Sequence, residues 1–468
     1  MSEQHSTIDG RAAQRVGRTA VVIGASMAGL CAARVLSERF ERVVVIDRDH
    51  LPDSPEARRL VPQGRHPHLL LPAGARLLES WFPGILDELR ASGAVDVDLC
   101  RDFYWYQGGG CQRRPASQAR GPAMSRPLLE STVRRRVGML DNVSIRDRTV
   151  AEGLVADASG ARITAVRLAS GETVASDLVI DASGRGARSL EWLESLGYQP
   201  PATSTVEVDT RYVSRVYRRT EVPRRDWEAA AVIGHPASKR LAMLLPMEGD
   251  RWILAIAGIN GESAPTDGEG MLAYARTFES PVIADVIAAS EALGEPVTHR
   301  FPANQRRHVE RLRRYPLGWA LLGDAVCSFD PIYGQGMTSA ALQAAALGVH
   351  LDRAGAVDRA FARSYFRAVA KIVNAPWSIA VGGDFVYEGT TGKKPIGTDV
   401  LNRYMNRVVK AGQHDDQVVI RLNEVVALLR GPQTLMAPAF MLRVLRAARR
   451  ASAETPATRR TLAPTDSH

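Results

Sequence analysis

The segment Val21–Leu30 (Val-Val-Ile-Gly-Ala-Ser-Met-Ala-Gly-Leu) constrains the fold of this chain more than any other part of the sequence. The apolar run Thr19–Ile23 predicts a buried parallel strand, and the apolar spacing over Met27–Glu38 predicts an amphipathic helix. A second strand is predicted over Arg42–Ile46, and Asp47 closes it. A strand, a glycine-containing turn, a helix and a second strand in this order are typical of a dinucleotide-binding site.

The turn between this strand and helix has residues that suit a bound pyrophosphate. Gly24 permits the tight turn, and Gly29 lets the helix pack close to the strand. Ser26 takes the middle glycine position of G-x-G-x-x-G, where its hydroxyl can donate to a phosphate oxygen. Asp47 lies where an acidic residue that binds the ribose hydroxyls is expected. The residues predicted to hold this half of a dinucleotide are Gly24, Ser26, Met27, Ala28, Gly29, Asp47 and Arg48.

A second nucleotide motif lies late in the chain, between Leu321 and Met337. Gly-Asp follows an apolar strand there, and a Pro precedes a Gly-x-Gly turn that opens a helix. Asp324 can hold a ribityl hydroxyl, and the backbone N–H groups of Gly334–Met337 can face the edge of a flavin ring. The residues predicted to hold the flavin half are Gly323, Asp324, Pro331, Gly334, Gln335, Gly336 and Met337.

With these motifs the chain resembles the flavoprotein monooxygenases of the p-hydroxybenzoate hydroxylase type, and among them the actinobacterial polyether-pathway olefin epoxidases. The resemblance covers Thr19 to about Leu347, and it includes the segments Val61–Leu69, Ser125–Leu129 and Pro331–Met337. It implies that FAD is the cofactor. It also implies that Arg126 lies along the ribityl-phosphate portion of FAD, with Asp324 on the ribityl chain and Gly334–Met337 beside the isoalloxazine.

Three positions depart from the pattern of that family. Ser183 stands where the family has Asp in its middle Asp-Gly motif, so the docking of reduced nicotinamide is left open. Cys327 replaces a His, and Thr338 stands where many relatives have Asn. These departures favour the epoxidase-like branch over the phenol hydroxylases.

The predicted fold class is α/β: a Rossmann-like FAD-binding domain, a second domain with a mainly antiparallel β-sheet that binds substrate, and a helical C-terminal region. The pattern predicts helical stretches over about Ala73–Leu89 and about Gly270–Ala292 and a hairpin turn at Gly249-Asp250. The predicted FAD-binding domain is discontinuous (residues 17–80, 120–200 and 310–350), and the substrate domain comprises residues 81–119 and 201–309. Residues 351–452 are expected to be helical and residues 453–468 disordered.

Composition excludes several classes of protein. The net charge is +9, but the arginines are scattered without interleaved aromatic residues, so no nucleic-acid partner is expected. No run reaches the ~18 apolar residues of a membrane span, and Met1–Arg18 has no apolar signal-peptide core, so we expect a cytoplasmic protein. The four cysteines lack metal-ligand or disulfide spacing, so no metal site is expected.

The predicted function is that of an FAD-dependent monooxygenase. It would insert one oxygen atom from O2, by epoxidation or hydroxylation through a flavin C4a-hydroperoxide, into an apolar polyketide, terpenoid or aromatic substrate. NAD(P)H would act as a transient reductant, or a separate flavin reductase would supply electrons. The alternatives are a flavin-dependent reductase or dehydrogenase acting on carbon-carbon bonds and a non-catalytic flavin-binding protein. A flavin halogenase is disfavoured because Trp-x-Trp-x-Ile-Pro is absent.

No catalytic acid or base is assigned from the sequence. His66 and His68 form an H-x-H pair without a third metal ligand, and contact with cofactor or substrate and a structural role both stay open. Tyr212, Tyr217 and Phe301 are predicted core residues that could also face the ring.

Overall fold

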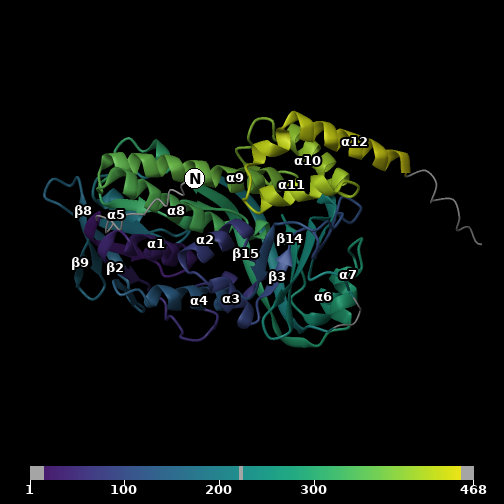
Figure 1. Ribbon diagram of the computed structural model, residues 1–468, viewed down its shortest axis with the longest axis horizontal. Coiled ribbons are helices and arrows are strands. Elements are labelled where there is room, and N and C mark those ends of the chain that lie inside the picture. The colour runs from purple at the N-terminus through teal and green to yellow at the C-terminus, as the bar shows by residue number, and fades with distance from the viewer. Residues whose placement is uncertain (1–14, 221–224, 455–468) are drawn as a thin grey trace, which may run out of the picture.

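The computed structural model describes residues 15–220 and 225–454, and two β-sheets organise it (Figure 1). The first sheet is parallel, in the order β16 (Trp319–Leu321), β10 (Leu178–Asp181), β1 (Gly17–Ile23), β2 (Phe40–Ile46) and β6 (Val143–Arg146). Helices α1 (Met27–Ser37) and α8 (Gly336–Ala354) pack against each other beside it. Residues Ala20–Val22 of β1 are fully buried, because helices and strands cover a parallel sheet on both faces. The predicted strand-helix-strand unit is confirmed.

Smaller elements surround this sheet. They are η1 (Pro62–Arg65), α2 (Pro72–Trp81), α3 (Ile85–Ala91), α4 (Arg126–Gly138), α5 (Ser189–Ser195) and a meander of β7 (Ala151–Ala156), β8 (Ile163–Leu168) and β9 (Thr173–Ala175). The helical stretch predicted over about Ala73–Leu89 forms as two helices, α2 and α3. The chain breaks at Pro83-Gly84, where Gly84 takes a φ of +80°, a left-handed conformation that ends one helix before the next begins.

The second sheet has eight strands and is mainly antiparallel. Its order is β17 (Cys327–Ser328), β15 (Ala292–Arg307), β11 (Thr203–Arg218), β14 (Arg251–Ile259), β13 (Arg240–Met247), β12 (Ala229–Ile233) and β4 (Phe103–Gln107), with β18 (Thr391–Gly392) beside β11. Helices α6 (Gly268–Ala275) and α7 (Val282–Ala288) pack on one face of it. Strands β3 (Val95–Asp98) and β5 (Arg120–Ala123) form a separate ribbon.

Two predictions for this region had different outcomes. The hairpin between β13 and β14 is confirmed, since Gly249 and Asp250 both have positive φ, +72° and +49°. The helical stretch predicted over about Gly270–Ala292 forms as two short helices, α6 and α7, because the chain breaks before Pro281, and β15 begins at Ala292.

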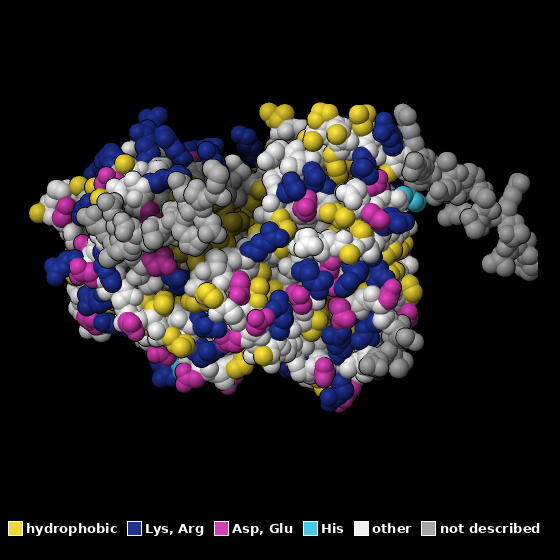
Figure 2. Space-filling model, in the orientation of Figure 1, with side chains coloured by type: hydrophobic (Ala, Val, Ile, Leu, Met, Phe, Trp, Pro, Cys, Tyr) yellow, Lys and Arg dark blue, Asp and Glu magenta, His cyan; other side chains and the backbone are white. Residues whose placement is uncertain are grey.

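The C-terminal region stands over the second sheet (Figure 1). It contains α9 (Arg359–Asp384), α10 (Thr398–Gly412), α11 (Asp416–Val426), η6 (Pro432–Met436) and α12 (Pro438–Glu454). Hydrophobic side chains are exposed over this region, among Lys and Arg, in Figure 2. Residues 453–454 close α12, and the rest of the tail predicted to be disordered lies outside the described residues. Among the helices described, none is both long enough and apolar enough to cross a bilayer.

Candidate functional site: a nucleotide turn that opens into an apolar chamber

The turn from β1 into α1 depends on two glycines. Gly24 has a φ of +104°, and a Cβ atom there would lie 2.6 Å from the carbonyl oxygen of Ala182. A Cβ atom on Gly29 would lie 1.7 Å from the carbonyl oxygen of Gly24. Both positions therefore exclude a side chain, and the helix begins close to the end of β1 with its first N–H groups free for an anion. This is the packing role that the sequence predicted, whereas their contact with a cofactor stays a prediction.

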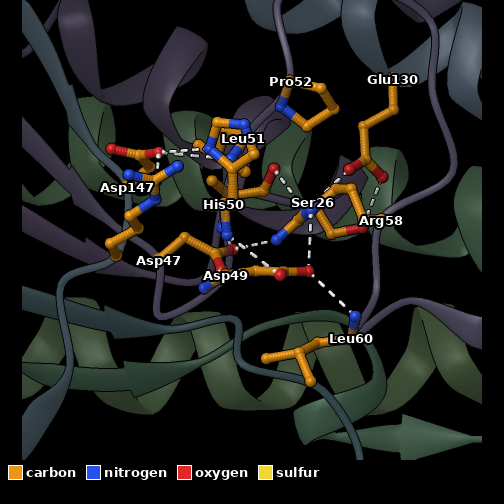
Figure 3. Close-up of polar contacts among 12 residues, drawn as sticks. Ser26, Asp47, Asp49, His50, Leu51, Pro52, Arg58, Leu60, Glu130 and Asp147 are labelled. Carbon is orange, nitrogen blue, oxygen red and sulfur yellow. Dashed lines mark hydrogen bonds and ion pairs between the residues drawn. The ribbon is translucent and has the colours of Figure 1, made fainter.

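An ionic network lies beside this helix N-terminus (Figure 3). The hydroxyl of Ser26 donates to Glu130 (2.7 Å) and accepts from the guanidinium of Arg126 (2.8 Å). Arg58 forms a buried ion pair with Glu130 (2.7 Å) and another with Asp47 (2.8 Å). Burial alone would raise the pKa of Glu130, but the charges of Arg126 and Arg58 outweigh it and hold that pKa below its ordinary value. The Glu130 carboxylate is thus ionised, and it accepts the hydroxyl of Ser26 and the Nε–H of Arg126 (3.1 Å), the two side chains that the sequence analysis placed beside the phosphates.

Asp47 lies at the end of β2, as predicted, next to the turn. Its carboxylate accepts the backbone N–H groups of Ala25 (2.7 Å) and Asp49 (2.8 Å), in addition to the ion pair with Arg58. A ribose at this position would share Asp47 with Arg58. Sequence reasoning missed Arg58 and Glu130, because their side chains come together across 72 positions of sequence and no local motif marks either.

The second motif follows β16 and packs against the first. Gly323 has a φ of +70°, and a Cβ atom there would lie 2.7 Å from that of Ala28, so this glycine permits the two motifs to approach. Asp324 follows in η4 (Gly323–Ala325). Burial raises the pKa of Asp324 above its ordinary value, although the charges of Arg126 and Arg185 act in the opposite direction.

The loop before α8 is held by a buried polar cluster. Asp330 caps η5 (Pro331–Tyr333) by accepting the N–H of Ile332 (3.1 Å), and it also accepts the hydroxyl of Thr210 (2.5 Å). Asp384 accepts from the amide of Asn304 (2.6 Å) and the hydroxyl of Tyr333 (3.0 Å). Burial raises the pKa of Asp330 to about 6 and that of Asp384 well above its ordinary value. These contacts fix the loop in the shape that exposes the N-terminus of α8.

One cavity of about 1390 Å³ joins the two motifs. The predicted residues at its wall are Ser26, Met27, Ala28, Arg126, Asp324, Pro331, Gly334, Gln335, Gly336 and Met337. The other predicted residues lie away from the wall: Gly24, Gly29 and Gly323 act in packing, Asp47 is in the ionic network and Arg48 is exposed. The residues at the wall fit FAD, because two helix N-termini, a guanidinium and a partly buried carboxyl face one continuous space.

The same cavity continues across one face of the second sheet. The register of the strands places Ile233, Leu241, Ala257, Tyr212 and His299 in one row, and all five line the cavity. A second row brings Trp105, Met243 and Ala255 to the same face. Cross-strand partners point to the same side of a sheet, so these rows form an apolar floor.

Helices of the C-terminal region form the roof of this space. Met405 and Val409 of α10, Leu422 of α11 and Leu435 of η6 line the cavity opposite the sheet. The sequence predicted helices here but gave no sign that they close a chamber. We call the space between the second sheet and these helices the apolar chamber.

The structure places the histidines and tyrosines whose roles the sequence left open. The ring of His66 is buried and its Nδ1 shares a hydrogen bond of 2.8 Å with the hydroxyl of Ser214, while His68 donates to the backbone oxygen of His66 (2.8 Å). Tyr212 lines the chamber, and Tyr217 points to the opposite face, into the core under α6 and α7. Within the described part of the chain, no group of three or more His, Cys, Asp or Glu side chains could hold a metal ion.

Fold and site together define an α/β protein of the dinucleotide-binding type, in which the cavity at the two glycine-containing motifs continues into the apolar chamber. The family of the FAD binding domain matches residues 18–355, well over half of the chain. The chain therefore belongs to this family of flavoproteins, and the predicted fold class and the FAD-binding domain are confirmed.

Similar proteins are known from sequence and structure. The chain is 36% identical over 396 residues to "Protein Rv3254" of Mycobacterium tuberculosis, which covers 80% of this chain and 81% of that protein. It is similar to the crystal structure of PqsL, a probable FAD-dependent monooxygenase from Pseudomonas aeruginosa, with 23% identity, a TM-score of 0.59 and coverage of 80% and 99% of the two chains. It is also similar to the flavin-dependent brominase Bmp2, with 14% identity, a TM-score of 0.63 and coverage of 93% and 99%. At these identities the two structures show a shared fold.

Proposed function

We propose that this protein is an FAD-dependent monooxygenase that inserts one oxygen atom of O2 into a large, apolar secondary-metabolite substrate by epoxidation or hydroxylation. The observation that carries the proposal is the single cavity that joins both flavin motifs to the apolar chamber. Its volume of about 1390 Å³ exceeds the ~300–1,000 Å³ of a typical small-ligand site, so cofactor and substrate have room together.

The protein's own residues would bind, orient and exclude water. The N-terminus of α1, with Arg126, would hold the pyrophosphate, and Asp324 would hold a ribityl hydroxyl. The N-terminus of α8 would stabilise negative charge on the ring. When bound, the reduced flavin supplies the chemistry, which is activation of O2 and transfer of one oxygen atom. The apolar floor and the helical roof would keep water from the reacting carbon.

The source of electrons is the second part of the proposal. Ser183, at the position of the expected nicotinamide-linked Asp, donates its N–H and its hydroxyl to Asp181, at 2.9 Å and 2.5 Å. The residue is thus engaged within its own loop. We infer that NAD(P)H visits transiently or that a separate reductase delivers reduced flavin.

The test is to purify the protein, measure FAD per chain, reduce the FAD anaerobically and admit air with candidate polyene or aromatic metabolites. The proposal expects a yellow protein and O2 consumption that is matched by a product carrying one added oxygen atom. Reduction of a substrate double bond without O2 consumption would instead support a reductase. A protein that cannot be loaded with FAD would refute every enzymatic alternative.

A further inference from the structure

The apolar chamber has one polar end. In the row that crosses the second sheet, Ile233, Leu241 and Ala257 are apolar, whereas Tyr212 and His299 are not. His66, directly after η1, packs edge-on against Tyr212 with 4.6 Å between ring centroids and lies 5.5 Å from the ring of His299. These three rings gather at the side of the chamber formed by β11 and β15.

Two polar atoms at this end are buried without a hydrogen-bond partner. They are the Nε2 atom of His66 and the hydroxyl of Tyr212, and the two residues are only 4% and 5% exposed. The hydrogen bond between Nδ1 of His66 and Ser214 fixes the orientation of the imidazole. Most buried polar atoms in proteins are paired, because an unpaired one loses its hydrogen bonds to water. Both residues border the cavity, so a polar group that enters this end lies next to both rings.

The two rings are uncharged at neutral pH. Burial lowers the pKa of His66 to about 3, and the charges of His299, His68 and Arg65 act in the same direction. Burial raises the pKa of Tyr212 above its ordinary value. Among the described residues, no charged side chain makes a hydrogen bond to either ring. A neutral donor and acceptor pair suits an uncharged oxygen and disfavours a carboxylate, which would lose its hydration without a charged hydrogen-bond partner in exchange.

We propose that His66 and Tyr212 form a subsite that binds an uncharged hydroxyl or carbonyl group of an otherwise apolar substrate. This inference rests on the proposed function, since the subsite shares its cavity with the loop Pro331–Gly336, beside which the flavin ring is expected. A substrate held by its oxygen at this end presents a fixed part of its carbon skeleton to the ring. His66 and Tyr212 are therefore positioning residues, which determine specificity and the site of oxidation.

The test uses the FAD-loaded protein and three probes of one shape, namely β-naphthol, naphthalene and β-naphthoate, with binding measured by equilibrium dialysis. The wild-type protein should bind naphthol about five- to tenfold more tightly than naphthalene, as expected for one or two neutral hydrogen bonds, and should bind naphthoate more weakly than naphthol. Tyr212→Phe removes only the hydroxyl and should reduce the preference for naphthol to less than twofold. His66→Phe should do the same.

The matched control is Tyr217→Phe, on the same strand but on its opposite face, which should keep the wild-type preference. An unchanged preference in both Tyr212→Phe and His66→Phe overturns the inference. A change in only the FAD dissociation constant or the visible flavin spectrum also overturns the inference, because it would show that His66 and Tyr212 contact FAD and not the substrate. If His66→Phe fails to fold, Tyr212→Phe decides the question. Failure to incorporate oxygen refutes the proposed function, whereas a wild-type protein that binds naphthol no more tightly than naphthalene refutes only this subsite.

Discussion

Replacing Gly29 by alanine tests the close approach of α1 to β1. The added Cβ atom would lie 1.7 Å from the carbonyl oxygen of Gly24, and such contacts do not fall below 3.0 Å in real structures, so the start of the helix must move outward by more than 1 Å. A shift of that size takes N–H groups out of hydrogen-bond range of a pyrophosphate. One lost hydrogen bond to a charged group costs about 1.5–3 kcal/mol, which corresponds to a roughly 10- to 100-fold weaker affinity for FAD.

The strain also affects the folded protein without FAD. Overpacking of this kind costs about 1–3 kcal/mol, and the better helix propensity of alanine recovers at most about 1 kcal/mol of it. The free energy of unfolding of the apoprotein should therefore fall, most clearly in urea titrations, while FAD affinity is measured by quenching of FAD fluorescence.

The control is Gly138→Ala, at the end of α4, where an added Cβ atom meets nothing within 4 Å. This variant should bind FAD as the wild type does and should unfold at the same or a slightly higher urea concentration. Wild-type FAD affinity in Gly29→Ala, with wild-type stability, would refute the assignment of this turn as the pyrophosphate site.

Three further changes have defined outcomes. Asp324→Ala should weaken FAD binding by about 10-fold, as loss of one hydrogen bond to a ribityl hydroxyl predicts, and equal FAD occupancy in both proteins would contradict this. Arg58→Met leaves the buried carboxylates of Asp47 and Glu130 with one partner fewer. The free energy of unfolding should therefore fall by about 3–5 kcal/mol. A loss under 1 kcal/mol would show that the ionic network contributes little to stability. The pKa of His66 is about 3 in the folded protein and near 6.5 in the unfolded chain. Between these two pH values the imidazole is therefore protonated in the unfolded chain and neutral in the folded protein. Stability should fall as pH drops below about 6.5, by roughly 1.4 kcal/mol per pH unit, and His66→Phe should remove that part of the slope in urea titrations at successive pH values.

The parts of the fold that were predicted correctly are those that local sequence determines. The strand Thr19–Ile23 is a run of apolar residues ended by a glycine, and the turn at Gly249-Asp250 needs two positive φ angles, which glycine and aspartate tolerate. Both signals act over a few residues. No distant part of the chain can reverse them at low cost.

The sequence analysis did not predict the breaks within the two helical stretches, and it did not predict strand β15. Pro83 and Pro281 each interrupt a helical pattern that otherwise continues. Strand β15 contains Gly294, Pro296 and Pro302, which favour a loop in isolation, and it forms because β11 supplies partners along its length.

The candidate site likewise contains residues that local sequence identifies and residues that only the tertiary structure brings together. Gly24, Gly323 and Gly334 could be identified from the sequence because each takes a positive φ in its turn, which glycine tolerates best. The ion pair of Arg58 with Glu130 and the meeting of His66 with Tyr212 depend on tertiary structure, which brings a loop to a helix or a strand far along the chain. The roof of the apolar chamber could not be predicted from the sequence either, because the apolar spacing in α10 and α11 predicts helices but does not indicate which surface they cover.

The most direct test of the central proposal is isotopic. The FAD-loaded protein is reduced anaerobically, mixed with O2 labelled with the heavy oxygen isotope in unlabelled water, and the product of an accepted apolar substrate is analysed by mass spectrometry. The proposal predicts one labelled oxygen atom in each product molecule. Label absent from the product, with all the O2 recovered as hydrogen peroxide or with oxygen drawn from water, would contradict it.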